Sequence, residues 1–445
     1  MTTTSSLLSH SATQLSRLVH EGAVSPGEIA AAALERIDAF DGRLKAWVAI
    51  DRVAVEAEAA LLDREARAGA FRGPLHGVPV GVKDIYDVSG LPTRANAAFL
   101  ADAPPAARDA ASVAALRKAG ALILGKTATT TFAMGDPAET VNPWNPAHTP
   151  AGSSSGSAAA VAAAMAPAAL GTQTAGSVLR PASFCGVVGF KPSFGRISRK
   201  GVIPFAWSLD TLGPLTRTVA DAALLLDVMT RPEWVAEPEG GRPDTAPQLG
   251  VVPRLFPNRL HAEMESMLAA AARRLASAGA RVEEAALPAE FELTLEAHHV
   301  IMAAEAAAFH SRTYGEHLPE YPPRLRALVE TGLLLPATAY LEAQRVRADL
   351  LQRTLPLLQR FDALLVPAAA GPAPEGLDFT GDPSFNAPWT MFGPPAIALP
   401  GGRDAQGLPL GLQLVGRPRA DEALLRVAAW CESVLGAAVP APLPA

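Results

Sequence analysis

Residues that build disulfide frameworks, metal clusters and membrane spans are scarce in this sequence. The chain of 445 residues has only two cysteines, Cys185 and Cys431, too few for a disulfide framework or a cysteine metal cluster. Its most apolar stretch, Ala158 to Leu170, is interrupted by Pro167 and is shorter than the roughly 20 residues that cross a membrane. We expect a buried helix there. These absences favour a globular protein of the reducing cytoplasm that does not contact membranes.

Charged residues are also sparse, and their balance is slightly acidic. They make up 18% of the chain and give a formal net charge of −6 at pH 7, whereas hydrophobic residues make up 49%. This composition excludes a broad cationic face for nucleic acid and provides the apolar side chains for a large core. Residues 1–18 lack the charged and apolar regions of a signal peptide, so we expect none.

Histidine patterns typical of metal sites are missing too. The sequence has no H-E-x-x-H motif, and His298-His299 lacks the spacing that places two ligands on one helix face. The other histidines of this region, His261, His310 and His317, lie in segments predicted to be helical or linker-like, without a distinctive setting. We therefore expect no metal and no cofactor.

The order of predicted elements favours an α/β fold. Residues 1–70 are predicted to be mainly helical, with a capping box at Ser25–Glu28. Val78–Val82 has the pattern of a short strand, and Val113–Ala119 and Ala121–Leu124 predict a helix followed by a buried strand. A strand, helix, strand order is typical of an α/β domain with a largely parallel sheet.

The second half of the chain begins after a segment rich in proline, glycine and charge at 231–249, which predicts a surface linker. Strands are predicted at Leu249–Val252 and Ala363–Val366, with alanine-rich helices between them and a last helix at Asp421–Leu435. At about 150 residues per domain, the length alone suggests about three domains.

Two short motifs match known patterns but lack the setting that the patterns require. Gly120–Thr127 matches the phosphate-binding pattern G-x-x-x-x-G-K-[ST], yet its variable positions, Ala-Leu-Ile-Leu, are typical of a strand interior. Gly152–Gly156 contains G-x-S-x-G, the nucleophile elbow of α/β-hydrolases, with Ser154 as nucleophile. That elbow follows a strand, whereas the proline-rich residues 142–150 cannot form one. Under this esterase alternative, Ser154→Ala would abolish activity.

Small residues gather around two groups of serines. Ser153–Ser155 precede an apolar segment and are expected at a buried helix N-terminus, which suits an anion or an oxyanion. In Gly171–Pro181, small residues flank Ser177, and the N–H groups of Thr174–Ser177 could face a developing oxyanion. An ordinary turn is the alternative for this second segment.

Lys83 ends the predicted strand at Val78–Val82, and two interpretations of it stay open. If the side chain is buried, its pKa falls toward neutrality and the amine can act as a base. If it is exposed, it forms a surface ion pair with the adjacent Asp84.

Together, these segments resemble the amidase signature family. The signature itself is similar to residues 152–193, GSSSGSAAAVAAAMAPAALGTQTAGSVLRPASFCGVVGFKPS. Supporting segments are RGPLHGVPVGVKD at 72–84, AGALILGKT at 119–127, NPWNPAHTPAGSSSG at 142–156, DALLVPA from Asp362 and LPLGLQLVG from Leu408. The resemblance extends from about residue 8 to 435 and is strongest over 72–217.

The resemblance implies one α/β domain in place of the three that the length suggests. It implies a large mixed β-sheet core covered on both faces by α-helices. We expect an N-terminal helical segment at 1–70, packed on the core, and a single catalytic domain at 71–445.

The resemblance also implies a Ser–cis-Ser–Lys triad, which needs no histidine. By position, Ser177 matches the nucleophile, Ser153 the bridging serine after a cis peptide bond, and Lys83 the general base. The amides that stabilise the oxyanion correspond to Thr174, Ala175, Gly176 and Ser177.

The sequence departs from the family pattern near these residues. Members commonly have Asp and Gly where this chain has Gln173 and Ala175, and often Glu where it has Thr131, changes that could reshape the substrate pocket. Arg180, three residues after Ser177, either binds a substrate carboxylate, as in malonamidase-like members, or is a structural arginine tied to backbone carbonyls. Ser154 and Met134 are further candidates for contact with substrate.

The function expected from this resemblance is hydrolysis of a small carboxylic amide to an acid and ammonia, by a stand-alone enzyme that forms a homodimer. The substrate would be malonamate-like if Arg180 binds a carboxylate. One alternative is the glutaminase subunit of a tRNA-dependent amidotransferase, which needs partner subunits. Another is a catalytically silent binding scaffold, against which the complete set of Lys83, Ser153 and Ser177 argues.

Overall fold

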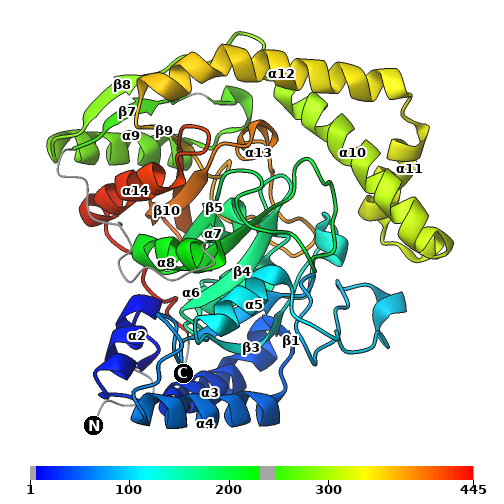
Figure 1. Cartoon of the computed structure of the whole chain (residues 1–445). Helices are drawn as coiled ribbons and strands as arrows, with labels where there is room; N and C mark the ends of the chain where they lie inside the picture. The colour runs from blue at the N-terminus through cyan, green and yellow to red at the C-terminus, as the bar shows by residue number, and fades with distance from the viewer. Residues whose placement is uncertain (1–6, 231–245, 254, 444–445) are drawn as a thin grey trace.

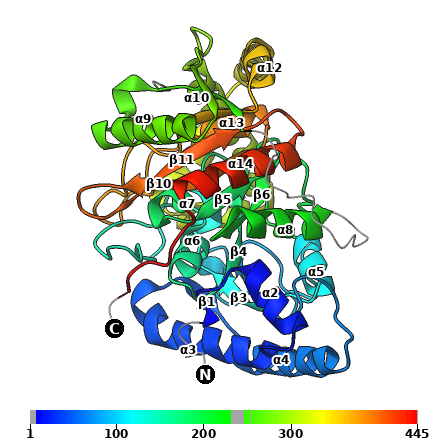
Figure 2. The same ribbon diagram turned by 90° about the vertical axis from the view of Figure 1, so that its left-hand side faces the viewer.

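The computed structural model describes residues 7–230, 246–253 and 255–443. Within these residues, eleven strands form one mixed sheet. In order across the sheet, the strands are β1 (Trp47–Ala49), β3 (Leu122–Thr127), β2 (Pro79–Lys83), β4 (Ala168–Gln173), β6 (Thr211–Thr216), β5 (Val188–Lys191), β10 (Ala396–Arg403), β11 (Pro409–Val415), β9 (Ala363–Pro367), β7 (Gln248–Val251) and β8 (Arg281–Glu284). Figures 1 and 2 show this sheet running through the molecule.

Helices surround the sheet. They are α2 (Ala12–His20), α3 (Pro26–Leu44), α4 (Arg52–Arg67), α5 (Ala111–Lys118), α6 (Ser155–Ala162), α7 (Leu179–Cys185), α8 (Val219–Thr230), α9 (Ala262–Ser277), α10 (Leu293–Tyr314), α11 (Pro323–Leu334), α12 (Ala337–Arg360), α13 (Ala387–Phe392) and α14 (Asp421–Leu435). Helices α8, α14 and α9 pack in a row along the sheet, as Figure 2 shows. Helices α11 and α12 both pack on α10, and the three helices project from the body (Figure 1).

The central strands explain why helices must cover both faces. Every residue of β2, β3 and β4 is buried, as is every residue of β6 and β11, so neither face of these strands meets solvent. Helix α6 packs against β2, β3, β4 and β6, and α7 packs against β5, β10 and β11. The α/β fold, with the large mixed sheet between helices that the family resemblance implies, is confirmed. The largely parallel sheet expected from the element order alone is wrong, because most strand pairs from β4 to β9 are antiparallel.

The N-terminal segment contributes to this sheet as well as to its helical cover. The predicted capping box at Ser25 is present, because Ser25 Oγ accepts a hydrogen bond from Glu28 N and the Glu28 carboxylate accepts one from Ser25 N. Strand β1 pairs with β3, so residues before 70 form one edge of the sheet. The division into residues 1–70 and 71–445 stays a prediction. Most of the predicted linker at 231–249 lies outside the described residues, and its last two residues belong to β7.

One helix prediction is wrong. The apolar stretch Ala158 to Leu170 is the end of α6 followed by the start of β4. Between them the chain turns at Ala164, which has a φ of 52°, and at Pro167, which cannot donate a helical hydrogen bond. A fully buried strand and a buried helix have the same apolar composition, so this short run could not reveal the change.

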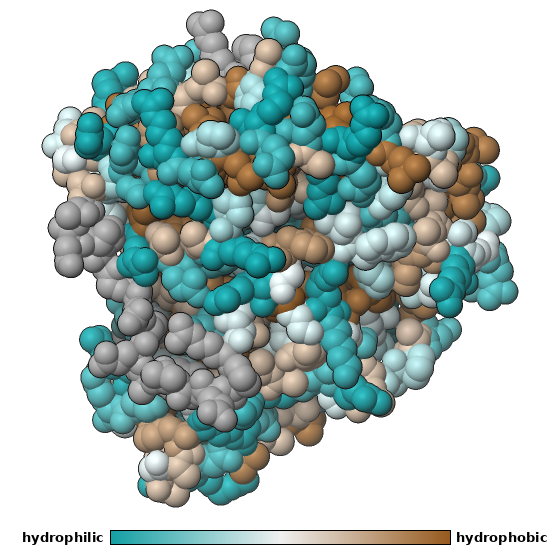
Figure 3. Space-filling view, turned by 45° about the horizontal axis from the view of Figure 1, so that its top comes forward, coloured by the Kyte–Doolittle hydropathy of each residue, from teal (hydrophilic) through white to brown (hydrophobic). Residues whose placement is uncertain are grey.

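The surface drawn in Figure 3 mixes hydrophilic and hydrophobic side chains, with small apolar patches among polar ones. Among the described residues, no helix is long and apolar enough to cross a membrane. In the same part of the chain, no group of three or more His, Cys, Asp or Glu side chains could hold a metal ion.

Candidate active site

The site forms where the parallel strands β2 and β4 end side by side. Lys83, the last residue of β2, is fully buried. Its Nζ lies within hydrogen-bond distance of Ser153 Oγ at 2.7 Å, Thr172 Oγ1 at 2.9 Å and Ser154 Oγ at 3.1 Å. Burial lowers the pKa of Lys83 well below its ordinary value, because three hydroxyl groups do not replace the hydration of an ammonium ion. The side chain is therefore suited to accept a proton.

The surface ion pair considered for Lys83 is wrong. Asp84 instead accepts from Lys126, whose Nζ lies 2.7 Å from Asp84 Oδ1, and both side chains are buried. Lys126 is also the lysine of the phosphate-binding pattern at Gly120–Thr127. That segment enters β3, where every residue is buried, so its backbone is no phosphate loop.

The three consecutive serines lie where α6 begins, as the sequence predicts. The peptide bond between Gly152 and Ser153 is cis. Ser154, expected to contact substrate, is instead fully buried, and its hydroxyl donates to Thr172 O and accepts from Thr172 N, each at 3.3 Å. A Cβ on Gly156 would clash with the carbonyl oxygen of Ala46. Only glycine therefore allows the first turn of α6 to pack so closely against the backbone at Ala46.

In the turn between β4 and α7, the carbonyl oxygens accept hydrogen bonds, whereas several N–H groups have no acceptor among the described residues. Thr174 O accepts from His298 Nε2 at 2.9 Å, Ala175 O accepts from Thr390 Oγ1 at 2.6 Å, and Gly176 O accepts from Arg180 N at 2.9 Å. Within the described residues, the N–H groups of Ala175, Gly176 and Ser177 have no acceptor. A turn fixed in this way can present several N–H groups to one negative oxygen.

The side chain of Gln173 stabilises this turn. Its side-chain Oε1 accepts from Val178 N at 2.9 Å and Leu179 N at 3.0 Å, and its Nε2 donates to Thr390 Oγ1 at 2.9 Å. The glutamine thus satisfies N–H groups at the start of α7. Gln173 and Thr131, two departures from the family pattern, do not line the cavity at Ser177, as far as the structure describes it. Ala175, the third departure, does line it.

Asp210 stabilises the same turn through Thr174. Its Oδ1 accepts from Thr174 Oγ1 at 2.6 Å, and its Oδ2 accepts from Phe205 N at 2.7 Å and Ala206 N at 3.0 Å. Burial raises the pKa of Asp210, and these hydrogen bonds oppose that rise. The carboxylate also raises the pKa of Lys83, against the larger effect of burial.

Arg180 is buried in α7, and one of its guanidinium nitrogens has no hydrogen-bond partner among the described residues. Its Nε donates to Thr380 O and its Nη2 to Gly152 O, both at 2.8 Å. Its Nη1 is buried without a hydrogen-bond partner in the described chain. Burial lowers the pKa of Arg180 to about 10, so the guanidinium is charged at neutral pH. Arg180 therefore holds the backbone beside Ser153 and keeps one donor for another group.

A cavity of about 290 Å³, which we call the serine cavity, brings most of the predicted residues together. Its lining includes Met134, Ser153, Thr174, Ala175, Ser177, Arg180, Met302 and Arg324. Met302 belongs to α10 and Arg324 to α11, so the projecting helices form part of the wall. Ser154 does not line this cavity, since it lies beneath the surface.

Three residues around the site were missed by sequence reasoning. Thr172 completes the hydroxyl shell of Lys83, Asp210 holds Thr174, and His298 bonds the carbonyl of Thr174. His298 had no distinctive setting in the sequence, yet it is buried, and burial lowers its pKa to about 4. Asp210 and His298 lie 36 and 124 residues beyond Thr174, so no local pattern could connect them.

A buried lysine bonded to a serine, with a second serine in the same cavity on a turn with free N–H groups, is an arrangement typical of an α/β acyl-transfer hydrolase. Comparison with known proteins identifies the family. The family model Amidase matches residues 28–425. The chain belongs to the amidase signature family, and it is a hydrolase that acts on amide C–N bonds.

Individual relatives cover nearly the whole chain. An amidase of Pseudomonas putida is 38% identical over 452 residues, which span 95% of each protein. A glutamyl-tRNA(Gln) amidotransferase subunit of Synechococcus sp. (strain RCC307) is 35% identical over 92% of this chain and 94% of its own length. The native peptide amidase of Stenotrophomonas maltophilia superposes with a TM-score of 0.83 and 30% identity, covering 98% of this chain and 99% of that one.

Proposed function

We propose that this chain hydrolyses a small carboxylic amide to an acid and ammonia through an acyl-enzyme on Ser177. Ser177 Oγ attacks the carbonyl carbon while its proton passes to Ser153 Oγ, and the Ser153 proton passes to Lys83 Nζ. The amides of Thr174, Ala175, Gly176 and Ser177 stabilise the oxyanion. The proton then returns along the same path to the nitrogen as the C–N bond breaks. Water hydrolyses the ester by the same route.

The observation that carries this proposal is the shell of Lys83. Its three partners are hydroxyl groups, and none is a carboxylate. A neutral amine has one lone pair, so one hydroxyl must donate to it. Ser154 Oγ donates to Thr172 O, which leaves Ser153 Oγ, at 2.7 Å, as the shortest contact and the one that borders the serine cavity. We assign Ser154 to the support of Lys83.

We further propose that Arg180 favours an acyl group with a free carboxylate, such as that of malonamate. The Nη1 atom is a buried, charged donor with no hydrogen-bond partner among the described residues, and the described lining of its cavity contains a second arginine, Arg324, and no acidic side chain. A carboxylate would satisfy this donor. Nε and Nη2 donate to the carbonyls of Thr380 and Gly152. Arg180 can therefore be structural through these two nitrogens and bind a substrate carboxylate through Nη1.

The alternative function is that of the amidotransferase glutaminase, since one such protein is 35% identical to this chain. Ammonia release by the isolated chain separates the two. The panel is malonamate, malonamide, propionamide, benzamide, glutamine and asparagine, with Ser177→Ala as the control. We expect release that is fastest with malonamate and absent in the control. Silence on the whole panel would favour the partner-dependent glutaminase, and faster release from neutral amides would remove the carboxylate preference. Homodimer formation and a cytoplasmic location stay predictions.

A further inference from the structure

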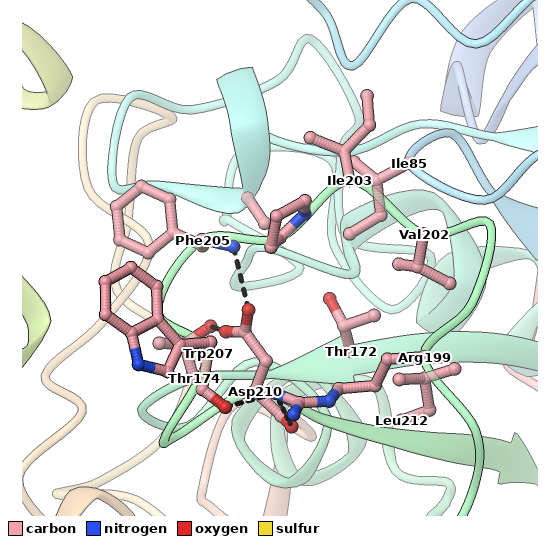
Figure 4. A pocket seen from close by; sticks show the side chains of 12 residues that line it. Ile85, Thr172, Thr174, Arg199, Val202, Ile203, Phe205, Trp207, Asp210 and Leu212 are labelled. Atoms are coloured by element: carbon pink, nitrogen blue, oxygen red, sulfur yellow. Dashed lines mark hydrogen bonds between the residues drawn. The ribbon is translucent and has the colours of Figure 1, made fainter. Parts of the chain in front are cut away.

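A second cavity of about 260 Å³ lies beside the serine cavity. We call it the lysine-side cavity, because its wall includes Thr172, which bonds Lys83, and Ile85, two residues beyond Lys83. Figure 4 shows the side chains of Ile85, Val202, Ile203 and Leu212 around its interior, with Thr172 pointing between them. None of these residues has a role in the proposed catalytic steps except through Lys83.

Several polar groups on this wall already have hydrogen-bond partners. Both carboxylate oxygens of Asp210 accept hydrogen bonds from Thr174, Phe205 and Ala206, one of which is drawn in Figure 4. Arg199 donates to Trp207 O, and its guanidinium lies 5.1 Å from the ring centroid of Phe194. The rest of the wall is mainly apolar, with a half-exposed indole, Trp207, and the partly exposed guanidinium of Arg199. Such a mainly apolar cavity suits a hydrocarbon group.

The two cavities share part of their walls near the reacting centre. They share Ala133, Thr174 and Phe205 in their walls. Thr174 begins the turn that carries Ser177, so the shared wall is beside the position of the scissile carbonyl. The acyl and amine halves of a trans amide extend in opposite directions from the C–N bond. Two cavities on either side of this shared wall can hold the two halves of one substrate.

We infer that the lysine-side cavity binds an apolar substituent on the leaving nitrogen, so that N-alkyl and N-benzyl secondary amides are substrates. This inference rests on the proposed function. Arg180, whose Nη1 suits the acyl half, lines the serine cavity, whereas the lysine-side cavity lies across the shared wall and is therefore left for the amine half. An apolar cavity of about 150 Å³ can hold benzene, so this one has room for a benzyl group.

The chemistry is unchanged by the substituent. The bond from Ser177 Oγ to the carbonyl carbon forms, the C–N bond breaks, and the nitrogen receives one proton from the Lys83–Ser153 path. The product is the primary amine R–NH₂ in place of ammonia. Water then releases the acid.

The test compares each primary amide that the chain hydrolyses with its N-benzyl derivative, by product analysis. We expect kcat/KM for the N-benzyl compound to be at least equal to that for the primary amide. Val202→Phe, which fills the lysine-side cavity, should lower the ratio of N-benzyl to primary kcat/KM at least tenfold. The matched control Val53→Phe lies on α4 at a 77% exposed position outside both cavities and should leave the ratio and the activity unchanged.

Hydrolysis of primary amides with no hydrolysis of N-benzyl amides would overturn the inference and leave the proposed function standing. An equal loss for both substrates in Val202→Phe would also overturn it. If the chain hydrolyses neither substrate, the proposed function fails, and a binding measurement then tests the role of the lysine-side cavity. Calorimetry with Ser177→Ala should then show N-benzylpropionamide binding at least tenfold more tightly than propionamide, with the difference lost on adding Val202→Phe. Equal affinity would reject the cavity's role.

Discussion

Replacing Lys83 by methionine removes the amine and keeps an unbranched side chain of similar length in the same space. The 0% exposure of Lys83 means that no water replaces the lost group. Ser154 loses its bond to Lys83 but keeps those to the backbone of Thr172, so among the described residues only the hydroxyls of Ser153 and Thr172 are left without a partner. Each loss costs about 1–3 kcal/mol of unfolding free energy, partly offset because a buried amine no longer needs desolvation. The variant should therefore fold.

Its activity should fall far more than its stability. Loss of a general base typically lowers the rate by about 10²–10⁴, or about 3–5 kcal/mol of transition-state stabilisation. The assay is ammonia release at pH 7 from the best primary amide, with urea unfolding as the check on folding. Lys191→Met is the matched control, because Lys191 is equally buried but, within the described residues, bonds only the carbonyls of Pro192 and Pro394 and lines neither cavity.

The pH dependence gives a second test of the same role. Since burial lowers the pKa of Lys83, the neutral amine is present well below pH 10.5, and kcat/KM should rise with pH as Lys83 loses its proton. That rise should disappear in Lys83→Met and persist in Lys191→Met. A rate for Lys83→Met within about threefold of the wild-type rate would refute the assignment of Lys83 as base.

Three further changes test the surrounding residues. Asp210→Asn removes the carboxylate that raises the pKa of Lys83, so the midpoint of the rise in kcat/KM with pH should move to lower pH; an unchanged midpoint would reject this coupling. Arg180→Ala should slow all amides, because Gly152 loses a donor, but should slow malonamate at least tenfold more than propionamide in competition assays; equal losses would assign Arg180 to structure alone. For His298, a native pKa of about 4 against 6.5 unfolded means that lowering the pH from 7 to 5 protonates only the unfolded chain and costs about 2 kcal/mol. The unfolding free energy of His298→Asn, measured with urea, should lack this part of the loss at acid pH. If the variant and the wild type showed the same pH dependence of stability, the buried neutral state of His298 would be contradicted.

The sequence alone predicted regular elements well where the residue pattern is local. Helix α14 has the predicted bounds, Asp421 to Leu435, because its apolar stripe is periodic and both ends are marked. Strand β8, at Arg281–Glu284, was missed inside a region expected to be helical, because it is a short, charged edge strand without an apolar pattern.

The site was predictable only in part for a physical reason. Lys83, Ser153 and Ser177 could be named because the signature of the family fixes their positions, whereas the residues alone left Lys83 either buried or paired with Asp84. The groups that hold the turn at Ser177, above all Asp210 and His298, come from distant segments that meet only when the sheet and α10 assemble. Tertiary packing determined them, and no spacing in the sequence records it.

Labelling with a serine-directed phosphonate tests the central claim most directly, because it needs no knowledge of the substrate. We predict a single covalent adduct on Ser177 by peptide mass spectrometry, absent in Ser177→Ala and formed at least a hundredfold more slowly in Lys83→Met. An adduct on Ser154 would point instead to the nucleophile-elbow chemistry of G-x-S-x-G. No adduct on the folded wild-type chain would contradict Ser177 as the nucleophile.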